Sequence, residues 1–166
     1  MHIEHHEVFP VGPDRLAELF ADEEFVRTTN ERMRAQNVQI QIADEPSGAF
    51  TVSVQRGQSM EHVPEPLRRF APHGIQLSQV ERWEAPAKDG SRSGSVQVGL
   101  EGIPVSFDGK MTLRQAGANG SELGLFGDLV ARIPLFGGAV ERAARPAVTG
   151  ALRAQRKAVE DWAGQQ

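Results

Sequence analysis

The sequence contains no cysteine and no tyrosine, and it has no long apolar run. Without cysteine, none of its 166 residues can form a disulfide, act as a thiolate nucleophile or bind zinc through sulfur. No stretch approaches the roughly 18 apolar residues of a membrane-spanning helix. Residues 1–10 lack the basic and then apolar pattern of a signal peptide. We therefore expect a cytoplasmic protein without disulfides or transmembrane segments.

The motifs of several enzyme classes are missing too. There is no P-loop, no G-x-G-x-x-G, no G-x-S-x-G and no H-E-x-x-H, which argues against NTPases, Rossmann dehydrogenases, triad hydrolases and zincins. His2, His5, His6, His62 and His73 supply metal donors, but His5 and His6 point to opposite faces of a strand. We predict no metal, no cofactor and no catalytic residue.

Charge is unevenly distributed along the chain. The formal net charge is −4, yet residues 132–166 hold six Lys and Arg against three Asp and Glu. A basic segment can bind nucleic acid or anionic lipid, or it can form the polar face of an amphipathic helix. Because aromatic residues are not interleaved with these charges, we favour the helix face and expect no nucleic-acid partner. Peripheral membrane contact and the oligomeric state stay open.

Apolar residues alternate with polar ones through most of the chain. This period of two predicts strands of an antiparallel sheet with one dry face, joined by short polar turns. The chain is long enough to bury about two thirds of its unfolded surface, so we expect one domain over residues 1–166. The predicted strands run through residues 3–9, 38–42, 50–56, 75–83, 96–100, 105–113 and 123–131. Residues 60–74 read as a connector with one short helix.

Three helices complete the pattern. Gly12 and Pro13 suit the N-cap and first position of a short helix, and Asp22 can cap a second one. From Phe136 to Trp162, apolar residues recur every three or four positions, which predicts a long amphipathic helix that Pro146 should kink. This helix must cover the dry face of the sheet, and twisted strands curl around it. Incomplete closure leaves a candidate ligand cavity.

The order strand, two helices, six strands and long helix resembles the START-like (SRPBCC) helix-grip superfamily. Local support comes from residues 3–11, 13–16 and 22–26, which resemble its first strand and paired helices. Residues 130–142 resemble a bacterial subfamily catalogued as a domain of unknown function. The resemblance implies an α+β fold in which a curved seven-stranded antiparallel sheet wraps around the C-terminal helix. It also implies a pocket for a hydrophobic ligand, with no fixed catalytic residues.

We predict which side chains line that pocket from their position on the dry strand face and the helix stripe. Polar residues on such a face are the informative ones, because they can orient the polar end of a ligand or pair with each other. His5 and Glu7 share the face of Ile3 and belong to the same polar group. The predicted ligand-binding residues are Phe50, Val52, Val54, Arg56, Gln79, Glu81, Trp83, Phe107, Met111, Leu125, Leu129, Phe136, Val140 and Val148.

Three functions fit this pattern. The first is non-enzymatic binding or transport of a hydrophobic small molecule or lipid. The second is a cyclase- or aromatase-like enzyme in which Glu81 or His5 acts as acid or base and Arg56 holds an oxyanion. The third is a membrane or protein interaction module that uses Leu135, Phe136 and the basic helix face. Residues 133–138 either border the pocket mouth, with Gly137 and Gly138 as a hinge, or staple the helix through Leu135 and Phe136.

Overall fold

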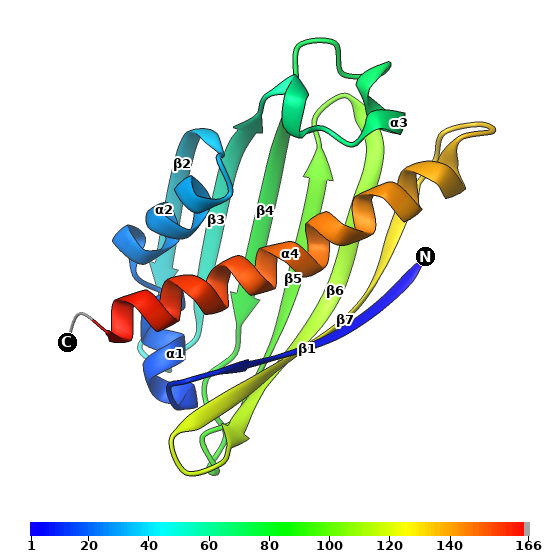
Figure 1. Cartoon of the computed structure of the whole chain (residues 1–166). Helices are drawn as coiled ribbons and strands as arrows, with labels where there is room; N and C mark the ends of the chain where they lie inside the picture. The colour runs from blue at the N-terminus through cyan, green and yellow to red at the C-terminus, as the bar shows by residue number, and fades with distance from the viewer. Residues whose placement is uncertain (165–166) are drawn as a thin grey trace.

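Seven antiparallel strands form a single curved sheet in the computed structural model, which describes residues 1–164 (Figure 1). The order across the sheet is β1-β7-β6-β5-β4-β3-β2. The strands are β1 (His2–Phe9), β2 (Gln36–Asp44), β3 (Phe50–Gln58), β4 (Ile75–Trp83), β5 (Arg92–Leu100), β6 (Ile103–Ala116) and β7 (Gly120–Ala131). The helices are α1 (Pro13–Phe20), α2 (Glu23–Arg32), α3 (Glu65–Arg68) and α4 (Gly137–Ala163).

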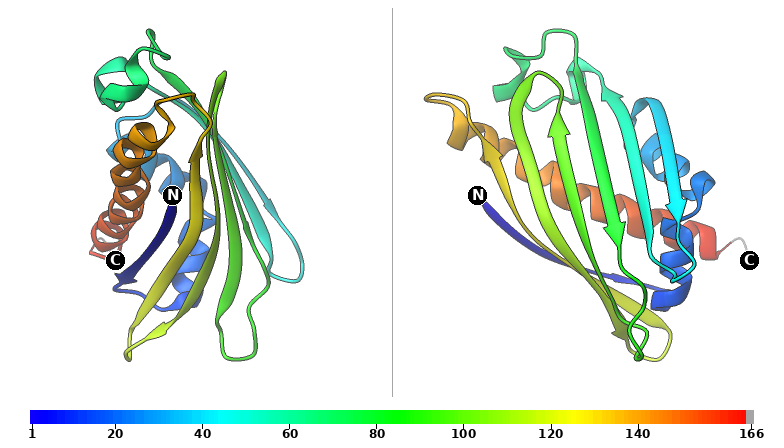
Figure 2. Two further views of the ribbon diagram at one scale, coloured as in Figure 1. Left: turned by 90° about the vertical axis from the view of Figure 1, so that its right-hand side faces the viewer. Right: turned by 180° about the vertical axis from the view of Figure 1, so that it is seen from behind.

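All helices within residues 1–164 lie on one face of the sheet, and none of them covers the other face (Figure 2). Side chains of a strand alternate between the two faces, so the apolar member of each pair turns toward the helices. In β3, Val52 and Val54 are buried, whereas Gln55 between Val54 and Arg56 is exposed. The expected one-sided sheet and the helix-grip fold are thereby confirmed.

The two short helices begin where the sequence predicts. Gly12 is the extended N-cap residue of α1, with Pro13 at the first helical position. The Asp22 side chain caps α2 by accepting a hydrogen bond from the backbone N–H of Phe25 at 2.9 Å. The connector adds a 3₁₀ turn, Met60–His62, before the single predicted helix α3. Pro146 lies inside α4 without ending it.

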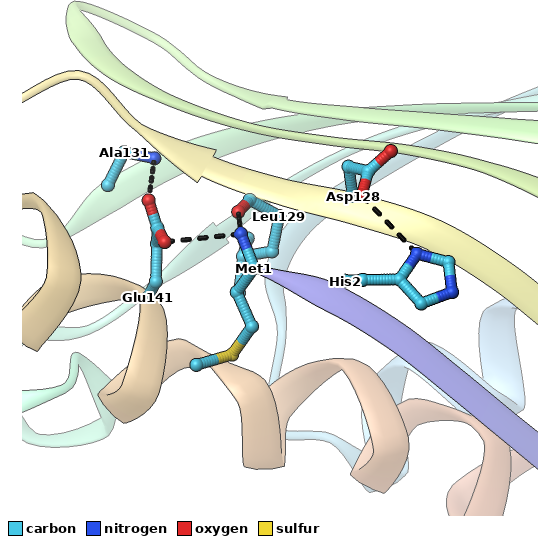
Figure 3. A network of polar contacts seen from close by, with 6 residues as sticks. All are labelled: Met1, His2, Asp128, Leu129, Ala131 and Glu141. Carbon is cyan, nitrogen blue, oxygen red and sulfur yellow. Dashed lines mark hydrogen bonds and ion pairs between the residues drawn. The ribbon is translucent and has the colours of Figure 1, made fainter.

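The start of α4 is fastened to the edge of the sheet through Glu141 (Figure 3). One carboxylate oxygen accepts a hydrogen bond from the Ala131 backbone N–H at 3.1 Å, and the other lies 3.2 Å from the amino group of Met1. That amino group also donates to the Leu129 carbonyl at 2.8 Å. These bonds lower the pKa of Glu141, and they join β1, β7 and α4 at one point.

The C-terminal half of α4 is fastened by two ion pairs. Arg156 lies 2.9 Å from a carboxylate oxygen of Glu7, a residue of β1 that is only 5% exposed. Arg32 at the end of α2 pairs with Asp161.

In residues 1–164, no helix has both the length and the apolar character needed to cross a membrane.

Candidate functional site: a cavity between the sheet and α4

A cavity of about 200 Å³ lies between the curved sheet and the helices. It forms because α4 packs mainly against β1, β7, α2 and α3, at the margins of the fold. The inner faces of the central strands are left uncovered, and they form the wall opposite α4. Because that wall is formed by aliphatic and aromatic side chains with a few polar ones, it has the character of a small-molecule site.

Ten of the fourteen residues predicted to bind a ligand lie on the cavity wall. They come from five elements that are far apart in the sequence, which the antiparallel pairing brings together. Binding itself is untested by this placement, so it stays a prediction. The ten residues are Val52, Val54, Arg56, Gln79, Glu81, Phe107, Met111, Leu125, Leu129 and Val148.

The other four predicted residues lie outside the cavity. Val140 is fully buried in the core, one residue before Glu141 in the first turn of α4. Phe136 lies on the outside, 38% exposed, with its ring centre 6.4 Å from that of Phe70. Trp83 and Phe50 stack on each other, 6.4 Å apart, within the core. Helix and strand periodicity correctly predict an apolar stripe, but they do not predict which of its side chains reach the cavity.

Trp83 is separated from the cavity by a side chain of α1. Its ring lies against Gly94 of β5, where a Cβ atom would be 2.8 Å from the indole. Phe20 of α1 also stacks on this ring, with the ring centres 6.0 Å apart, and Phe20 itself lines the cavity. The sequence does place Phe20 on the inward stripe of α1, but nothing in its spacing shows that it covers Trp83.

A row of polar side chains crosses the wall from β3 to β4. Arg56 Nη1 donates to Gln79 Oε1 at 3.1 Å, and Gln79 Nε2 donates to Glu81 Oε1 at 2.8 Å. Trp83 Nε1 completes the row by donating to Glu81 Oε2 at 3.4 Å. Gln79, Glu81 and Trp83 share a face because they alternate along β4, and Arg56 is diagonal to Gln79 across the β3–β4 pair.

The low-dielectric setting of this row perturbs both charged members. Burial lowers the pKa of Arg56 to about 10, and the charge of Glu81 offsets part of that shift. Burial raises the pKa of Glu81, while the hydrogen bonds from Trp83 and Gln79 and the charge of Arg56 oppose the rise. Arg56 therefore remains a cation at neutral pH, and Glu81 keeps its proton to a higher pH than an ordinary glutamate does.

His5 and Glu7 do not belong to this site, contrary to the sequence prediction. Both lie on β1, on the face that α4 covers; His5 Nε2 is 2.8 Å from Glu7 Oε2, and Arg156 contacts the other oxygen. The parity was right, but α4 packs against the edge strand β1, and no residue of β1 is among the described residues that line the cavity. Nowhere in residues 1–164 do three or more His, Asp or Glu side chains gather as metal ligands would.

The cavity also includes side chains that we did not predict from the sequence. The helix pair supplies Phe20, Phe25, Val26, Thr29, Asn30 and Met33. The apolar spacing of the two helices predicted an inward face. It did not predict that this face borders the cavity rather than packing directly on a strand. On α4, Ala144, Ala151 and Leu152 join Val148. Positions 144, 148, 151 and 152 share one helix face, so this periodicity was a usable signal.

Two glycines lie beneath the ring of Phe107, a residue of the cavity wall. Gly109 and Gly127 are paired across β6 and β7, and the Phe107 ring lies over both. A Cβ atom on Gly127 would lie 2.6 Å from Phe107 Cζ and 2.5 Å from the Asp108 carbonyl oxygen. Because neither glycine has a side chain, the ring lies close to the sheet.

Comparison with solved structures identifies the fold. A START superfamily protein from Mycobacterium smegmatis is 12% identical, with 97% of this chain and 98% of that chain covered and a TM-score of 0.60. An aromatase/cyclase from Streptomyces sp. R1128 is 14% identical, covering 96% and 93%, with a TM-score of 0.61. A protein from Thermus thermophilus is 13% identical, covering 97% and 95%, also at 0.61. At these identities the likeness concerns the fold alone.

Sequence comparison gives the family. No curated protein matches the sequence. A family profile, however, matches residues 4–163, almost the whole chain. The resemblance of residues 130–142 to an uncharacterised subfamily of the START-like superfamily agrees with this match. The chain belongs to the family described as a protein of unknown function, DUF2505, and it has the START-like fold.

Proposed function

We propose that this protein binds or carries a compact apolar molecule in the cavity between its sheet and α4, without catalysing a reaction. The observation that carries the proposal is an unfilled space behind a one-sided sheet, walled mainly by apolar side chains. A core that needed only stability would be packed to the density of an organic crystal. In this proposal, residues 1–166 act as one ligand-binding domain.

The cavity volume limits the ligand class. At about 200 Å³ it is smaller than the roughly 300–1,000 Å³ of common small-molecule sites. A single short chain or a small ring system suits this space, whereas both acyl chains of a bilayer lipid do not. Of the ligand types expected from the sequence, we therefore favour the hydrophobic small molecule over the lipid.

A fluorescent apolar probe tests this function. We expect N-phenyl-1-naphthylamine, which is neutral, to bind the purified protein saturably with enhanced emission. Val98→Phe places a larger side chain on the wall and should weaken binding about tenfold or more, which corresponds to about 1.4 kcal/mol. Gln97→Phe is the matched control, because Gln97 is the exposed neighbour on the same strand.

The outcome is decided by comparing the two variants. Thermal unfolding first establishes that both are folded. Unchanged probe binding in Val98→Phe, or equal losses in the two variants, would place the probe outside the cavity and contradict the proposal.

A second candidate function is docking on an anionic membrane surface. It is favoured by Leu135, whose side chain is fully exposed. The backbone φ of Leu135 is 70°, a value that residues other than glycine rarely adopt. Beside it, Phe136 and Phe70 are partly exposed, and the Arg69 guanidinium lies 4.6 Å from the centre of the Phe136 ring. An apolar tip with adjacent cations is what a negatively charged bilayer attracts.

The cyclase-like alternative keeps only part of its expected residues. Arg56 and Glu81 share the cavity wall, but His5 lies beneath α4. The aromatase/cyclase from Streptomyces sp. R1128 supports this alternative through the likeness of its fold. We therefore rank binding ahead of catalysis.

A further inference from the structure

Arg56 is a buried cation that has no ion-pair partner within residues 1–164. It is 8% exposed, yet none of its nitrogens lies within 4.0 Å of a carboxylate there. Its single hydrogen bond goes to the neutral amide of Gln79. Buried charges in proteins are normally paired, since leaving one unpaired costs several kcal/mol. The other guanidinium N–H groups have no acceptor from the described chain.

The interposed amide explains how the cation is tolerated and why it stays available. Gln79 accepts from Arg56 and donates to Glu81, so the two charges are linked through a neutral group rather than neutralised in direct contact. Both Glu81 oxygens already accept hydrogen bonds, from Gln79 and from Trp83. The carboxylate is thus held away from the guanidinium, whose unused donors belong to a residue of the cavity wall.

We propose that the cavity selects apolar molecules that carry one acidic group, a carboxylate or a comparable oxyanion, and that Arg56 binds this group. A guanidinium presents a planar fork of donors that matches a carboxylate, and charge-assisted bonds of this kind are about twice as strong as neutral ones. An amine would meet the cation directly and be repelled. An alcohol would satisfy one donor and leave the charge unpaired.

This inference rests on the proposed function, because it requires a ligand in the cavity. The same wall also explains the rest of the specificity. Val54 and Leu77 are the direct strand partners of Gln79 and Arg56, and both line the cavity, so aliphatic surface surrounds the guanidinium. A second acidic group on the ligand would have to be buried in a cavity whose described lining residues hold no cation other than Arg56.

Three eight-carbon probes that differ only in their head group test the proposal. Octanoate, octan-1-ol and octylamine are titrated at pH 7 against protein loaded with N-phenyl-1-naphthylamine, and displacement gives each dissociation constant. We expect octanoate to bind at least about tenfold more tightly than octanol, and octylamine to bind most weakly. Arg56→Gln should remove the preference for octanoate. Arg82→Gln, an exposed arginine of β4 that bonds Gln97, should keep it.

Each result decides between the two levels of the proposal. If octanol binds as well as octanoate to the wild-type protein, the acidic ligand class is overturned while apolar binding in the cavity stands. If neither the fluorescent probe nor any eight-carbon compound binds, the proposed function fails and the inference fails with it. If Arg56→Gln does not fold, the wild-type ranking of the three head groups still decides, since it needs no variant.

Discussion

Glu81 is the residue through which we expect the stability of the fold to depend on pH. Its carboxyl sits in an apolar wall, and burial raises its pKa more than the neighbouring donors and Arg56 lower it. A carboxyl whose pKa is higher in the folded state than in the unfolded chain binds more protons when folded. The free energy of unfolding therefore falls as pH rises from the ordinary glutamate pKa through the raised one.

Glu81→Gln tests this dependence. We expect the variant to lose the part of the pH profile that Glu81 causes, so that the wild-type stability relative to the variant declines as pH rises. Urea denaturation at a series of pH values from acid to neutral measures the difference. Glu84→Gln removes an exposed carboxylate just beyond β4 and should leave the wild-type slope unchanged. Parallel curves for wild type and Glu81→Gln would contradict the assignment.

Among the elements, α4 is joined to the sheet by polar contacts at two points that are far apart along its length. Glu141 joins its first turn to β1 and β7, and Arg156 joins its second half to Glu7. Glu7 is buried, so its carboxylate relies on Arg156 and on His5 to replace water. Between the two fastenings, Val148 and Ala151 face the cavity. The helix is thus fastened to the sheet on both sides of the segment that faces the cavity.

Arg156→Ala should destabilise the fold, because it leaves a buried carboxylate with His5 as its remaining partner. We expect a loss of about 1–3 kcal/mol in the free energy of unfolding, measured by urea denaturation. Arg153→Ala, an exposed arginine one turn earlier, should change stability by less than about 0.5 kcal/mol. In a double-mutant cycle with Glu7→Gln, additive effects of the two changes would show that the pair is not coupled.

The sequence was sufficient to predict the strands and helices, but it was not sufficient to predict which residues line the cavity. Strand parity placed Gln79, Glu81 and Arg56 on the inner face, and that placement follows from local geometry alone. Depth does not. Trp83 has the same parity as Glu81 but is covered by Phe20, and His5 has the right parity on a strand that α4 covers. Which inner residue meets space depends on how α1 and α4 dock, and no period in the sequence encodes docking.

The segment 133–138 was interpreted from the sequence either as a border of the pocket mouth or as a staple of the helix, and the structure shows a different arrangement. Ile133 is buried, but Leu135 neither staples the helix nor borders the cavity. Phe136 instead lies against Phe70, a residue of the connector between β3 and β4. Composition could not reveal this contact because it joins segments more than sixty residues apart in the sequence.

The molecule as a whole has a charge asymmetry that matters for the membrane candidate. The exposed side of α4 carries Arg142, Arg145 and Arg153, on a chain whose net charge is −4. Phe136 is the N-cap residue of this helix and packs against Phe70, so the apolar tip lies at the start of α4. Surface attraction of this kind decays within a Debye length, about 8 Å at physiological salt, so it is weakened by added salt.

Vesicle sedimentation tests whether this surface docks. We expect the protein to pellet with vesicles containing phosphatidylserine at low salt and to be released at high salt, with little binding to pure phosphatidylcholine. Leu135→Ser should reduce pelleting without lowering thermal stability, because the leucine side chain buries no surface. Val8→Ser is a control, since Val8 is another exposed apolar residue and lies on β1. Absence of pelleting at low salt would remove membrane docking as a function.

The pairing of β1 with β7 has a consequence for the order in which the chain can assemble. His2 pairs with Asp128 and Phe9 with Ser121, so β1 is synthesised about a hundred residues or more before the strand it pairs with. At about 5–20 residues per second, β1 waits on the order of ten seconds after leaving the ribosome. During that interval Ile3 and Phe9, both buried in the finished fold, have no β7 to pack beside. β1 can therefore complete its pairing only after β7 has been made, and contacts of such long range slow folding.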